Sequence, residues 1–392
     1  MSLSIRPWSR CLAWSLAALF AIASPSAFAG EAAPQVDLVG KLKPFVENHA
    51  LAGAVTMVVN KDGVLSHQAI GLADIAANKP MPPDALVWIA SMSKPLTATV
   101  LMMLVDEGKI DVDAPVAKYL PEFAEMQVET KTGDQVTRKK AERPILVRHV
   151  LAHTSGLLFL LPAEKGKIDV LPIAESVTQS AKLPLTFEPG TGWSYSNCGT
   201  NVAGRIIELV EGKPFEEVMR TRLFIPLGMV DTTSFPTAAQ LTRLAKSYRP
   251  TKDKSALDEI QINYLSYPLD ASTRFACPGG GLFSTAKDLA RYARMILAGG
   301  ELDGRRYLSA ASLAQMISKQ TGDLPNGYGF CFSVNGDYYG HGGAYATDLA
   351  FERKHGLATI FLVQHNGFAG TNGGKILPIF KQAALTAFGA KK

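Results

Sequence analysis

Residues 89–95 read Ile-Ala-Ser-Met-Ser-Lys-Pro, and the apolar residues that follow predict the first long helix of the chain, Pro95–Asp106. Pro95 fits the first turn of that helix, where its missing N–H would lack a partner in any case. Ser91 and Lys94 are three residues apart, so both side chains lie on one helical face. A serine hydroxyl is a weak nucleophile, and a neighbouring lysine can accept its proton if burial lowers the lysine pKa. The alternative is an N-cap serine beside a solvated lysine.

A second Ser-x-x-Lys, at Ser284 and Lys287, tests how specific this pattern is. Thr285 is followed three residues later by Asp288, and a capping box explains that site. Lys287 also begins a polar helix face, which implies contact with solvent. The helix after the first pattern is instead apolar nearly all round, so we expect its lysine to be partly desolvated.

A tyrosine and an asparagine stand two residues apart farther along the chain. Residues 193–197 read Trp-Ser-Tyr-Ser-Asn, after the Pro/Gly-rich loop 187–192 and before a helix. Tyr195 can serve as general acid or base if cations lower its pKa. Asn197 can orient both Lys94 and a substrate carbonyl. Taken alone, a Tyr-x-Asn is more often a pair of loop packing residues.

A histidine followed by two glycines closes a predicted strand near the C-terminus. In His341-Gly342-Gly343-Ala344, the glycines let a substrate approach the backbone closely. We expect the N–H of Ala344 to act beside the N–H of Ser91 as an oxyanion hole. His341 and Gly343 are therefore candidates for substrate binding. The alternative for this segment alone is a glycine-rich strand end.

Hydrophobic residues make up 47% of the 392 residues, enough for a sizeable core. β-Branched runs joined by turn signals predict hairpins near both chain ends, and the middle carries helical spacing. The predicted strands are 54–60, 64–71, 328–334, 338–341, 349–351 and 357–363, and the further predicted helices are 146–152, 173–180, 200–211, 214–223, 287–297 and 376–388. These pieces indicate an α/β (α+β) fold, with an antiparallel sheet built from both chain ends and flanked by helices. Residues 127–143 are expected to form a polar surface excursion, whereas residues 237–272 carry no clear pattern.

The motifs Ser-x-x-Lys, Tyr-x-Asn and His-x-Gly, in this order, resemble those of the penicillin-recognising serine hydrolases, specifically the class C β-lactamase-like family. The segments 153–157, 187–190 and 279–285 support the resemblance, which covers most of residues 36–390. It implies a β-lactamase/transpeptidase-like fold. The implied domains are a discontinuous α/β sheet domain at 36–110 and 276–392, and a mostly helical inserted domain at 111–275.

One departure from the family pattern bears on the substrate. β-Lactamases of this family carry Lys-Thr-Gly where this chain has His341-Gly342-Gly343, and their lysine helps to hold the substrate carboxylate. A histidine is mostly neutral near pH 7. The His-x-Gly motif is more similar to the esterases and D-aminopeptidases of the family.

The sequence therefore predicts an exported serine hydrolase that acts on carboxylic esters through an acyl-enzyme on Ser91. Ser91 attacks the ester carbonyl, Lys94 and Tyr195 move its proton, and water deacylates the enzyme without a cofactor. A D-amino-acid peptidase, or a DD-carboxypeptidase with weak β-lactamase activity, acting on cell-wall-type amides is the first alternative. A non-catalytic acyl-binding sensor on the same fold is the second. The acyl-chain preference and the oligomeric state stay open.

The first 29 residues have the three parts of a secretory signal peptide. Arg6 and Arg10 form a positive n-region, residues 11–23 are apolar, and residues 27–29 read Ala-Phe-Ala. The apolar run is too short to span a membrane as a helix; an uncleaved anchor is the alternative. We expect a mature protein that begins near Gly30, has no membrane span and is periplasmic or secreted. Cleavage lowers the net charge from +5 to +3, too small a value for a nucleic-acid binder.

The cysteine and histidine patterns argue against other chemistries. Cys198, Cys277 and Cys331 remain after cleavage, so at most one disulfide can form, and no Cys-x-x-Cys indicates a zinc or redox site. His149 and His153 are four residues apart, but no glutamate follows His149 as a zinc protease requires, so no metal site is predicted. The sequence also lacks a Gly-x-Ser-x-Gly nucleophile elbow.

Overall fold

The structure is a computed structural model that describes residues 36–389. The predicted signal peptide at residues 1–29 lies outside this range. Within it, no helix is both long enough and apolar enough to cross a membrane. Cys198, Cys277 and Cys331 are buried and free, and burial raises the pKa of each thiol to about 12. They therefore pack as small hydrophobic side chains.

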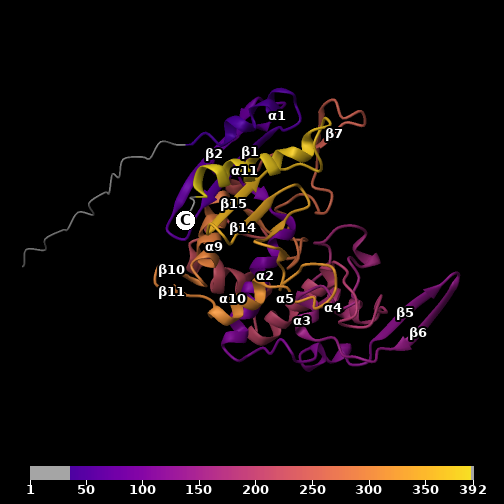
Figure 1. The fold of residues 1–392 in the computed structure, drawn as a ribbon. Coiled ribbons are helices and arrows are strands. Elements are labelled where there is room, and N and C mark those ends of the chain that lie inside the picture. Colours follow the sequence, from indigo (N-terminus) through magenta and orange to yellow (C-terminus); the bar gives the residue numbers. More distant parts are fainter. Residues whose placement is uncertain (1–35, 390–392) are drawn as a thin grey trace, which may run out of the picture. The chain divides into compact units, whose positions relative to one another are not determined.

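An antiparallel sheet with strands from both ends of the chain lies at the centre of the described fold. Across the sheet the strands are, in order, β12 (Ser333–Asn335), β13 (Tyr338–Gly342), β14 (Asp348–Glu352), β15 (Leu357–Leu362), β1 (Gly53–Val59), β2 (Val64–Asp74) and β3 (Lys79–Pro80). The N-terminal hairpin β1–β2 joins the C-terminal strands because β1 pairs with β15 (Figure 1). The prediction of a sheet built from both chain ends is confirmed.

Helices and short strand pairs make up much of the remaining described chain. The helices are α1 (Lys43–Glu47), α2 (Ser93–Asp106), α3 (Val147–Leu151), α4 (Ile173–Ala181), α5 (Asn197–Glu211), α6 (Phe215–Met219), α7 (Ile225–Leu227), α8 (Ala238–Leu241), α9 (Ala286–Leu297), α10 (Ala310–Ile317) and α11 (Ile376–Phe388). The short pairs are β4 (Val87–Trp88) with β9 (Phe283–Ser284), β5 (Gln127–Thr132) with β6 (Gln135–Lys140), β7 (Ser247–Pro250) with β8 (Leu257–Ile260), and β10 (Glu301–Leu302) with β11 (Arg305–Arg306). The predicted helix 376–388 matches α11, whereas 214–223 is divided between α6 and a π-helical turn at Arg220–Phe224.

Strand β1 is buried along its whole length and, apart from Thr56, consists of apolar residues and glycine. Side chains alternate between the two faces of a strand. Val55 and Met57 belong to the core on the side where α9 packs. Ala54 and Val58 belong to the core that contains Phe380 of α11. A strand that is exposed on one face alternates apolar and polar residues, whereas a strand that is covered on both faces does not.

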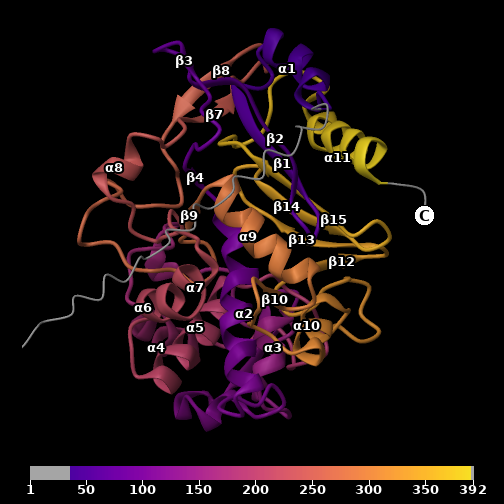
Figure 2. The same cartoon turned by 90° about the vertical axis from the view of Figure 1, so that its left-hand side faces the viewer.

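Helix α2 runs through the middle of the helical layer (Figure 2) and has no solvent-facing stripe along most of its length. Every residue from Ser93 to Leu104 is buried, because apolar residues occupy all sides of the helix. It contacts α5, α10 and the sheet strand β13. A helix held on all sides gives its first turn a fixed position next to the sheet.

Helix α5 begins at Asn197, ahead of the predicted start at residue 200. The reason is Ser196, whose Oγ accepts a hydrogen bond from the Gly199 N–H at 2.8 Å. A serine at this position satisfies a donor that the first helical turn leaves free. The cap places Tyr195 just outside the helix and Asn197 in its first turn, and α5 packs against α2.

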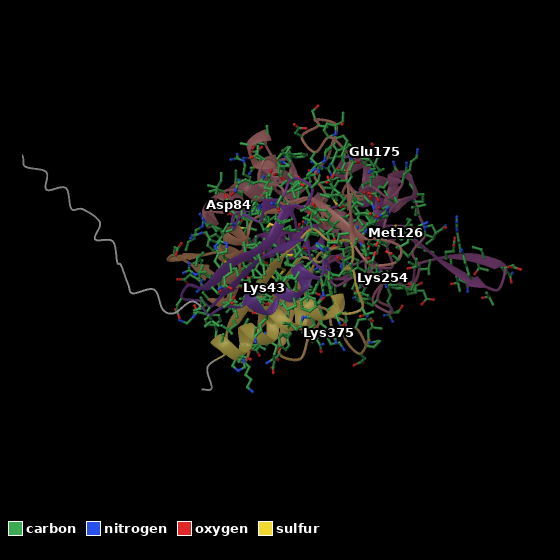
Figure 3. All side chains as sticks on the ribbon, turned by 90° about the horizontal axis from the view of Figure 1, so that it is seen from above. Lys43, Asp84, Met126, Glu175, Lys254 and Lys375 are labelled. Atoms are coloured by element: carbon green, nitrogen blue, oxygen red, sulfur yellow. The ribbon has the colours of Figure 1, made fainter. Side chains whose placement is uncertain are left out.

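Residues 127–143, expected to be a polar surface excursion, contain the hairpin β5–β6. Its outer strand is exposed at every position. Figure 3 shows the hairpin extending away from the neighbouring elements beyond Met126. The excursion is thus a regular two-stranded hairpin rather than an irregular loop.

Residues 237–272, which carry no clear sequence pattern, form α8, the pair β7–β8 and a loop that returns to the core. A fully buried ion pair holds this loop: Arg274 Nε donates to Asp169 Oδ2 at 2.7 Å. Asp169 also accepts a hydrogen bond from the Ser266 N–H at 3.0 Å. Removing either partner would leave an unpaired buried charge, so we expect the ion pair to stabilise this loop against the core.

Candidate active site

Ser91 lies in a 3₁₀ turn directly ahead of α2. The residue before it, Ala90, has a left-handed backbone with φ 47°, which costs a non-glycine residue about 1–2 kcal/mol. Two hydrogen bonds hold the turn: Ser93 Oγ donates to Ala90 O at 2.6 Å, and the Ile89 N–H donates to Leu282 O at 3.0 Å. A strained turn fixed by its surroundings is typical of functional sites.

Lys94 lies at the centre of the site and is fully buried. Its Nζ donates to Asn197 Oδ1 and to the Gly279 carbonyl oxygen, both at 2.6 Å. Ser91 Oγ lies 3.4 Å from the same nitrogen. The structure therefore brings together the serine, lysine and asparagine of the first two motifs, and adds a backbone carbonyl as a further partner.

The ring of Tyr195 packs against the side-chain nitrogen of Lys94. Lys94 Nζ lies 4.6 Å from the centroid of the phenol ring, within the range of a cation–π interaction for a protonated lysine. The Tyr195 hydroxyl lies 3.4 Å from His341 Nε2. The second and third motifs thus meet at this hydroxyl group.

His341 is a buried imidazole with a defined tautomer. Its Nδ1 lies 2.7 Å from the Gly342 carbonyl oxygen; since a carbonyl only accepts, Nδ1 carries the proton. Nε2 is then the acceptor, and the Tyr328 hydroxyl donates to it at 2.9 Å. Burial, followed by the positive charge of Lys94, lowers the pKa of His341 from 6.5 to about 3. The histidine is therefore neutral near pH 7, as expected from the sequence.

His153 packs behind Tyr195 and is fully buried. The two ring centroids lie 4.5 Å apart, and His153 Nδ1 accepts a hydrogen bond from the Ser196 N–H at 3.2 Å. Burial, with the charge of Lys94 as the second cause, holds the pKa of His153 well below 6.5. A neutral ring thus supports Tyr195 without adding charge to the site.

The turn after β13 places Ala344 on the cavity wall. The Gly343 N–H donates to Thr347 O at 2.7 Å. A Cβ at Gly343 would overlap Thr347 Oγ1 and lie 2.6 Å from Ile89 O. Only glycine fits this position, so the turn packs directly against the segment that leads to Ser91.

A cavity of about 380 Å³ opens over these groups. It is lined by Trp88, Ala90, Ser91, Phe159, Ile168, Tyr195, Asn197, Tyr264, Gly279, Gly280, His341, Gly342 and Ala344. Within the described range of the chain, no lysine or arginine lines this cavity. Its aromatic and aliphatic walls suit a small, largely apolar molecule held by a few polar groups.

The second Ser-x-x-Lys has different surroundings. Ser284 is fully buried and its Oγ lies 2.8 Å from Thr232 Oγ1, whereas Lys287 is exposed. Thr285 caps α9, with its Oγ1 accepting a hydrogen bond from the Asp288 N–H at 3.4 Å. The Asp288 carboxylate, however, accepts from the backbone N–H of residue 231 instead of returning to the cap. The predicted capping box is therefore only half formed.

Sequence reasoning missed three contributors to the site. Tyr328 was assigned only to a strand, and Tyr264 lies in the segment without a pattern. The Gly279 carbonyl was noted only within a motif of the family resemblance. Hydrogen bonds to backbone carbonyls and the packing of loop residues produce no periodic pattern of apolar residues in the sequence. At Gly279 the glycine itself is the signal, because a Cβ there would lie 2.8 Å from Asn197 Oδ1.

We expect the folded protein to lose stability as the pH falls below about 6.5, because three buried histidines are neutral. Burial lowers the pKa of His341 to about 3, that of His365 to about 4 and that of His153 well below 6.5. Between the pKa of each histidine in the folded protein and about pH 6.5, the unfolded chain therefore binds more protons than the folded protein does. Each histidine contributes a loss of up to about 1.4 kcal/mol per pH unit in that window. Urea unfolding midpoints at pH 7, 6 and 5 measure this loss.

His365→Gln provides the control for that measurement. His365 Nε2 accepts a hydrogen bond from the Ala52 N–H at 3.1 Å, and a glutamine carbonyl offers the same acceptor without titrating. The midpoint of this variant should vary less with pH than that of the parent protein. Midpoints that stay constant from pH 7 to pH 5 in both proteins would contradict the expectation.

Comparisons with known proteins identify relatives along most of the chain. The family model described as Beta-lactamase matches residues 38–383. The chain is 32% identical over 300 residues to penicillin-binding protein 4 of Amycolatopsis lactamdurans, covering 76% of this chain and 72% of that protein. It is 28% identical over 360 residues to esterase EstB of Burkholderia gladioli, covering 82% of this chain and 88% of that one.

Solved structures give the same picture of the fold. EstCE1, described as a hydrolase with promiscuous acyltransferase activity, superimposes with a TM-score of 0.74 at 21% identity. The match covers 88% of this chain and 97% of that one. At this level of identity the likeness shows the fold alone.

Proposed function

We propose, from the premise that this chain belongs to the β-lactamase family of serine hydrolases, that it hydrolyses small neutral carboxylic esters through an acyl-enzyme on Ser91. The observation that carries the proposal is the environment of Lys94 Nζ. Asn197 Oδ1 and the Gly279 carbonyl oxygen, each 2.6 Å from it, can only accept hydrogen bonds. These two acceptors hold Lys94 Nζ in place 3.4 Å from Ser91 Oγ, where the lysine can exchange a proton with the serine hydroxyl.

The reaction follows from that arrangement. Ser91 Oγ bonds to the ester carbonyl carbon as its proton passes to Lys94, and the N–H groups of Ser91 and Ala344 stabilise the oxyanion. The carbonyl–oxygen bond to the alcohol then breaks, and Tyr195 with Lys94 returns a proton to the leaving oxygen. Water adds to the acyl-enzyme by the same route, releasing the acid and restoring Ser91.

The site favours neutral substrates over carboxylate-bearing ones. A β-lactam or a peptide stem presents a carboxylate that needs a cationic partner. His341 holds the position where the resemblance implies a lysine in β-lactamases, and its pKa of about 3 leaves it uncharged near pH 7. This supports ester hydrolysis over the amide-hydrolase alternative.

The activity is tested with a short-chain chromogenic ester and with release of D-Ala from a D-amino-acid peptide. We expect ester hydrolysis by the parent protein and none by Ser91→Ala. Release of D-Ala without ester hydrolysis would replace the proposal with the amide-hydrolase alternative. A stable acyl adduct in intact-mass data, without turnover, would favour an acyl-binding sensor.

His341→Lys should shift preference toward substrates that carry a free carboxylate. The added ammonium supplies a charge-assisted hydrogen bond to that group, so we expect kcat/KM for a β-lactam relative to a neutral ester to rise about 10-fold or more. His341→Gln, which adds no charge, is the matched control. If the ratio does not change in the lysine variant, other cavity residues set the preference.

We also propose that the protein is exported, on the basis of the signal-like pattern at residues 1–29. Export implies cleavage after residue 29. N-terminal sequencing of the purified protein should therefore begin at Gly30. Material that retains Met1 would contradict export by this route.

A further inference from the structure

Aromatic rings from separate segments line the cavity beside Ser91. Trp88 and Tyr264 stack with centroids 6.1 Å apart and an interplanar angle of 30°. The ring of Phe159 lies 6.1 Å from that of Tyr195. Phe159 remains 44% exposed at the cavity wall, although a large apolar side chain is usually covered.

We infer that the preferred esters carry an aromatic ring, which packs against Phe159 and Tyr264; this inference rests on the proposed ester hydrolysis. Aromatic pairs favour centroid distances of 4.5–7 Å and add attraction beyond the burial of apolar area. The cavity already contains pairs of this kind, and Ile168, which is 6% exposed, supplies an aliphatic wall beside them. A ring entering the cavity therefore meets aromatic partners, whereas a saturated group gains only burial.

Tyr264 is held in place before any substrate binds. Its carbonyl oxygen accepts a hydrogen bond from the Ile168 N–H at 2.9 Å, and the Asn263 N–H donates to the Tyr345 hydroxyl at 3.0 Å. The buried Arg274–Asp169 ion pair secures the same loop. These contacts fix the backbone around Tyr264, and its ring stacks on Trp88 with centroids 6.1 Å apart, so the ring needs little further ordering when a ligand binds.

Two substrate pairs test the inference and show which part of the ester carries the ring. Benzyl acetate and cyclohexylmethyl acetate differ in the alcohol, and methyl phenylacetate and methyl cyclohexylacetate differ in the acyl group. We expect the aromatic-to-saturated ratio of kcat/KM to fall about 2- to 10-fold in Phe159→Leu and in Tyr264→Leu, for at least one pair. Comparing ratios between proteins cancels the intrinsic reactivity of each ester.

Phe235→Leu and Tyr338→Leu are matched controls, because these residues are 39% and 42% exposed and lie outside this cavity. Their ratios should equal those of the parent protein. Unchanged ratios in the Phe159 and Tyr264 variants, with esters still hydrolysed, would overturn the inference of an aromatic substrate. The proposed ester hydrolysis would then still stand. A parent protein that hydrolyses none of the four esters would overturn the proposed function as well.

A second, independent observation concerns Tyr328, which is buried and shares one acceptor with Tyr195. His341 Nε2 has a single lone pair, and it lies 2.9 Å from the Tyr328 hydroxyl and 3.4 Å from the Tyr195 hydroxyl. The geometry points to Tyr328 as a positioning residue: it occupies this lone pair, so the Tyr195 hydroxyl stays available to Ser91 and the leaving oxygen. Burial raises the pKa of Tyr328 well above 10, so its phenol remains a donor.

Tyr328→Phe tests this role. Without that hydroxyl, Tyr195 can turn its proton toward His341, and we expect kcat to fall about 10-fold or more with KM nearly unchanged. At 3.4 Å from His341 Nε2 the Tyr195 hydroxyl replaces the lost donor only in part, so the pKa of His341 rises and the acid limb of the kcat/KM profile should move to higher pH. The other titratable groups that face His341 are Tyr195, Lys94 and His153, and they are present in both proteins.

Tyr339→Phe is the matched control, since Tyr339 is a buried tyrosine that stacks on Phe351 at 4.8 Å. It should leave kcat and the acid limb unchanged. Equal effects of the two variants, or no effect of Tyr328→Phe, would overturn the positioning role. A measurement on the parent protein adds a check that does not depend on variant folding: ¹⁵N shifts should report the Nδ1–H tautomer of His341, and an Nε2–H tautomer would contradict it.

Discussion

Tyr195→Phe should lower the turnover of esters by about 10²–10⁴-fold, the usual contribution of a positioned acid or base. The phenol ring packs against both Lys94 and His153, with its centroid 4.6 Å from Lys94 Nζ and 4.5 Å from the imidazole centroid. Phenylalanine keeps that packing and removes only the hydroxyl. The loss should therefore appear in kcat, while the unfolding midpoint stays close to that of the parent protein.

The result distinguishes two routes for the proton. Steady-state kinetics on a chromogenic ester, with the unfolding midpoint as the control for folding, provide the measurement. A near-normal rate in a folded Tyr195→Phe protein would show that proton transfer runs through Lys94 alone. The role proposed for Tyr328 would then lose its basis too, because it acts through Tyr195.

Gly343→Ala should abolish most ester hydrolysis, because the added methyl group has no room. It would overlap Thr347 Oγ1 and lie 2.6 Å from Ile89 O. Both neighbours belong to the segments that hold Ser91 and Ala344, so the proposed oxyanion hole must widen or shift. Loss of one oxyanion donor typically lowers kcat by about 10²–10³-fold. Steady-state kcat for a short-chain ester measures the loss.

Gly342→Ala is the matched control on the same turn. The nearest atom to a Cβ at Gly342 is Thr347 O, at an ordinary contact distance of 3.5 Å. This variant should keep most of its activity, although Gly342 borders the cavity. Equal losses in the two variants would show that the turn tolerates no side chain at all, and full activity in Gly343→Ala would contradict the oxyanion assignment.

Elements with a local signal could be predicted from the sequence. The hairpin β1–β2 and the helix α11 follow from β-branched runs, turn residues and helical spacing, which depend only on neighbouring residues. Helix α2 was recognisable as buried because its apolar residues occupy every side. The spacing of Ser91 and Lys94 placed them on one helical face, and the order of the three motifs pointed to one site.

Features that depend on distant contacts could not be predicted. Asp288 leaves its expected partner for a backbone N–H on another loop. Tyr264 reaches the cavity through a loop held by a buried ion pair. Tyr328 meets His341 only because the chain turns back there. None of these contacts has a period or a spacing in the sequence, so only the folded structure reveals them.

Labelling with a serine-reactive phosphonate, followed by peptide mapping, tests the central claim that Ser91 is the nucleophile. Both Ser91 and Ser284 carry a lysine three residues later, so the four-residue pattern does not distinguish them. Ser91 lies at the cavity with Lys94 Nζ 3.4 Å away, whereas Ser284 is buried beside Thr232. We expect an adduct on the Ser91 peptide that disappears in Ser91→Ala. An adduct on the Ser284 peptide, or labelling that survives Ser91→Ala, would contradict the account.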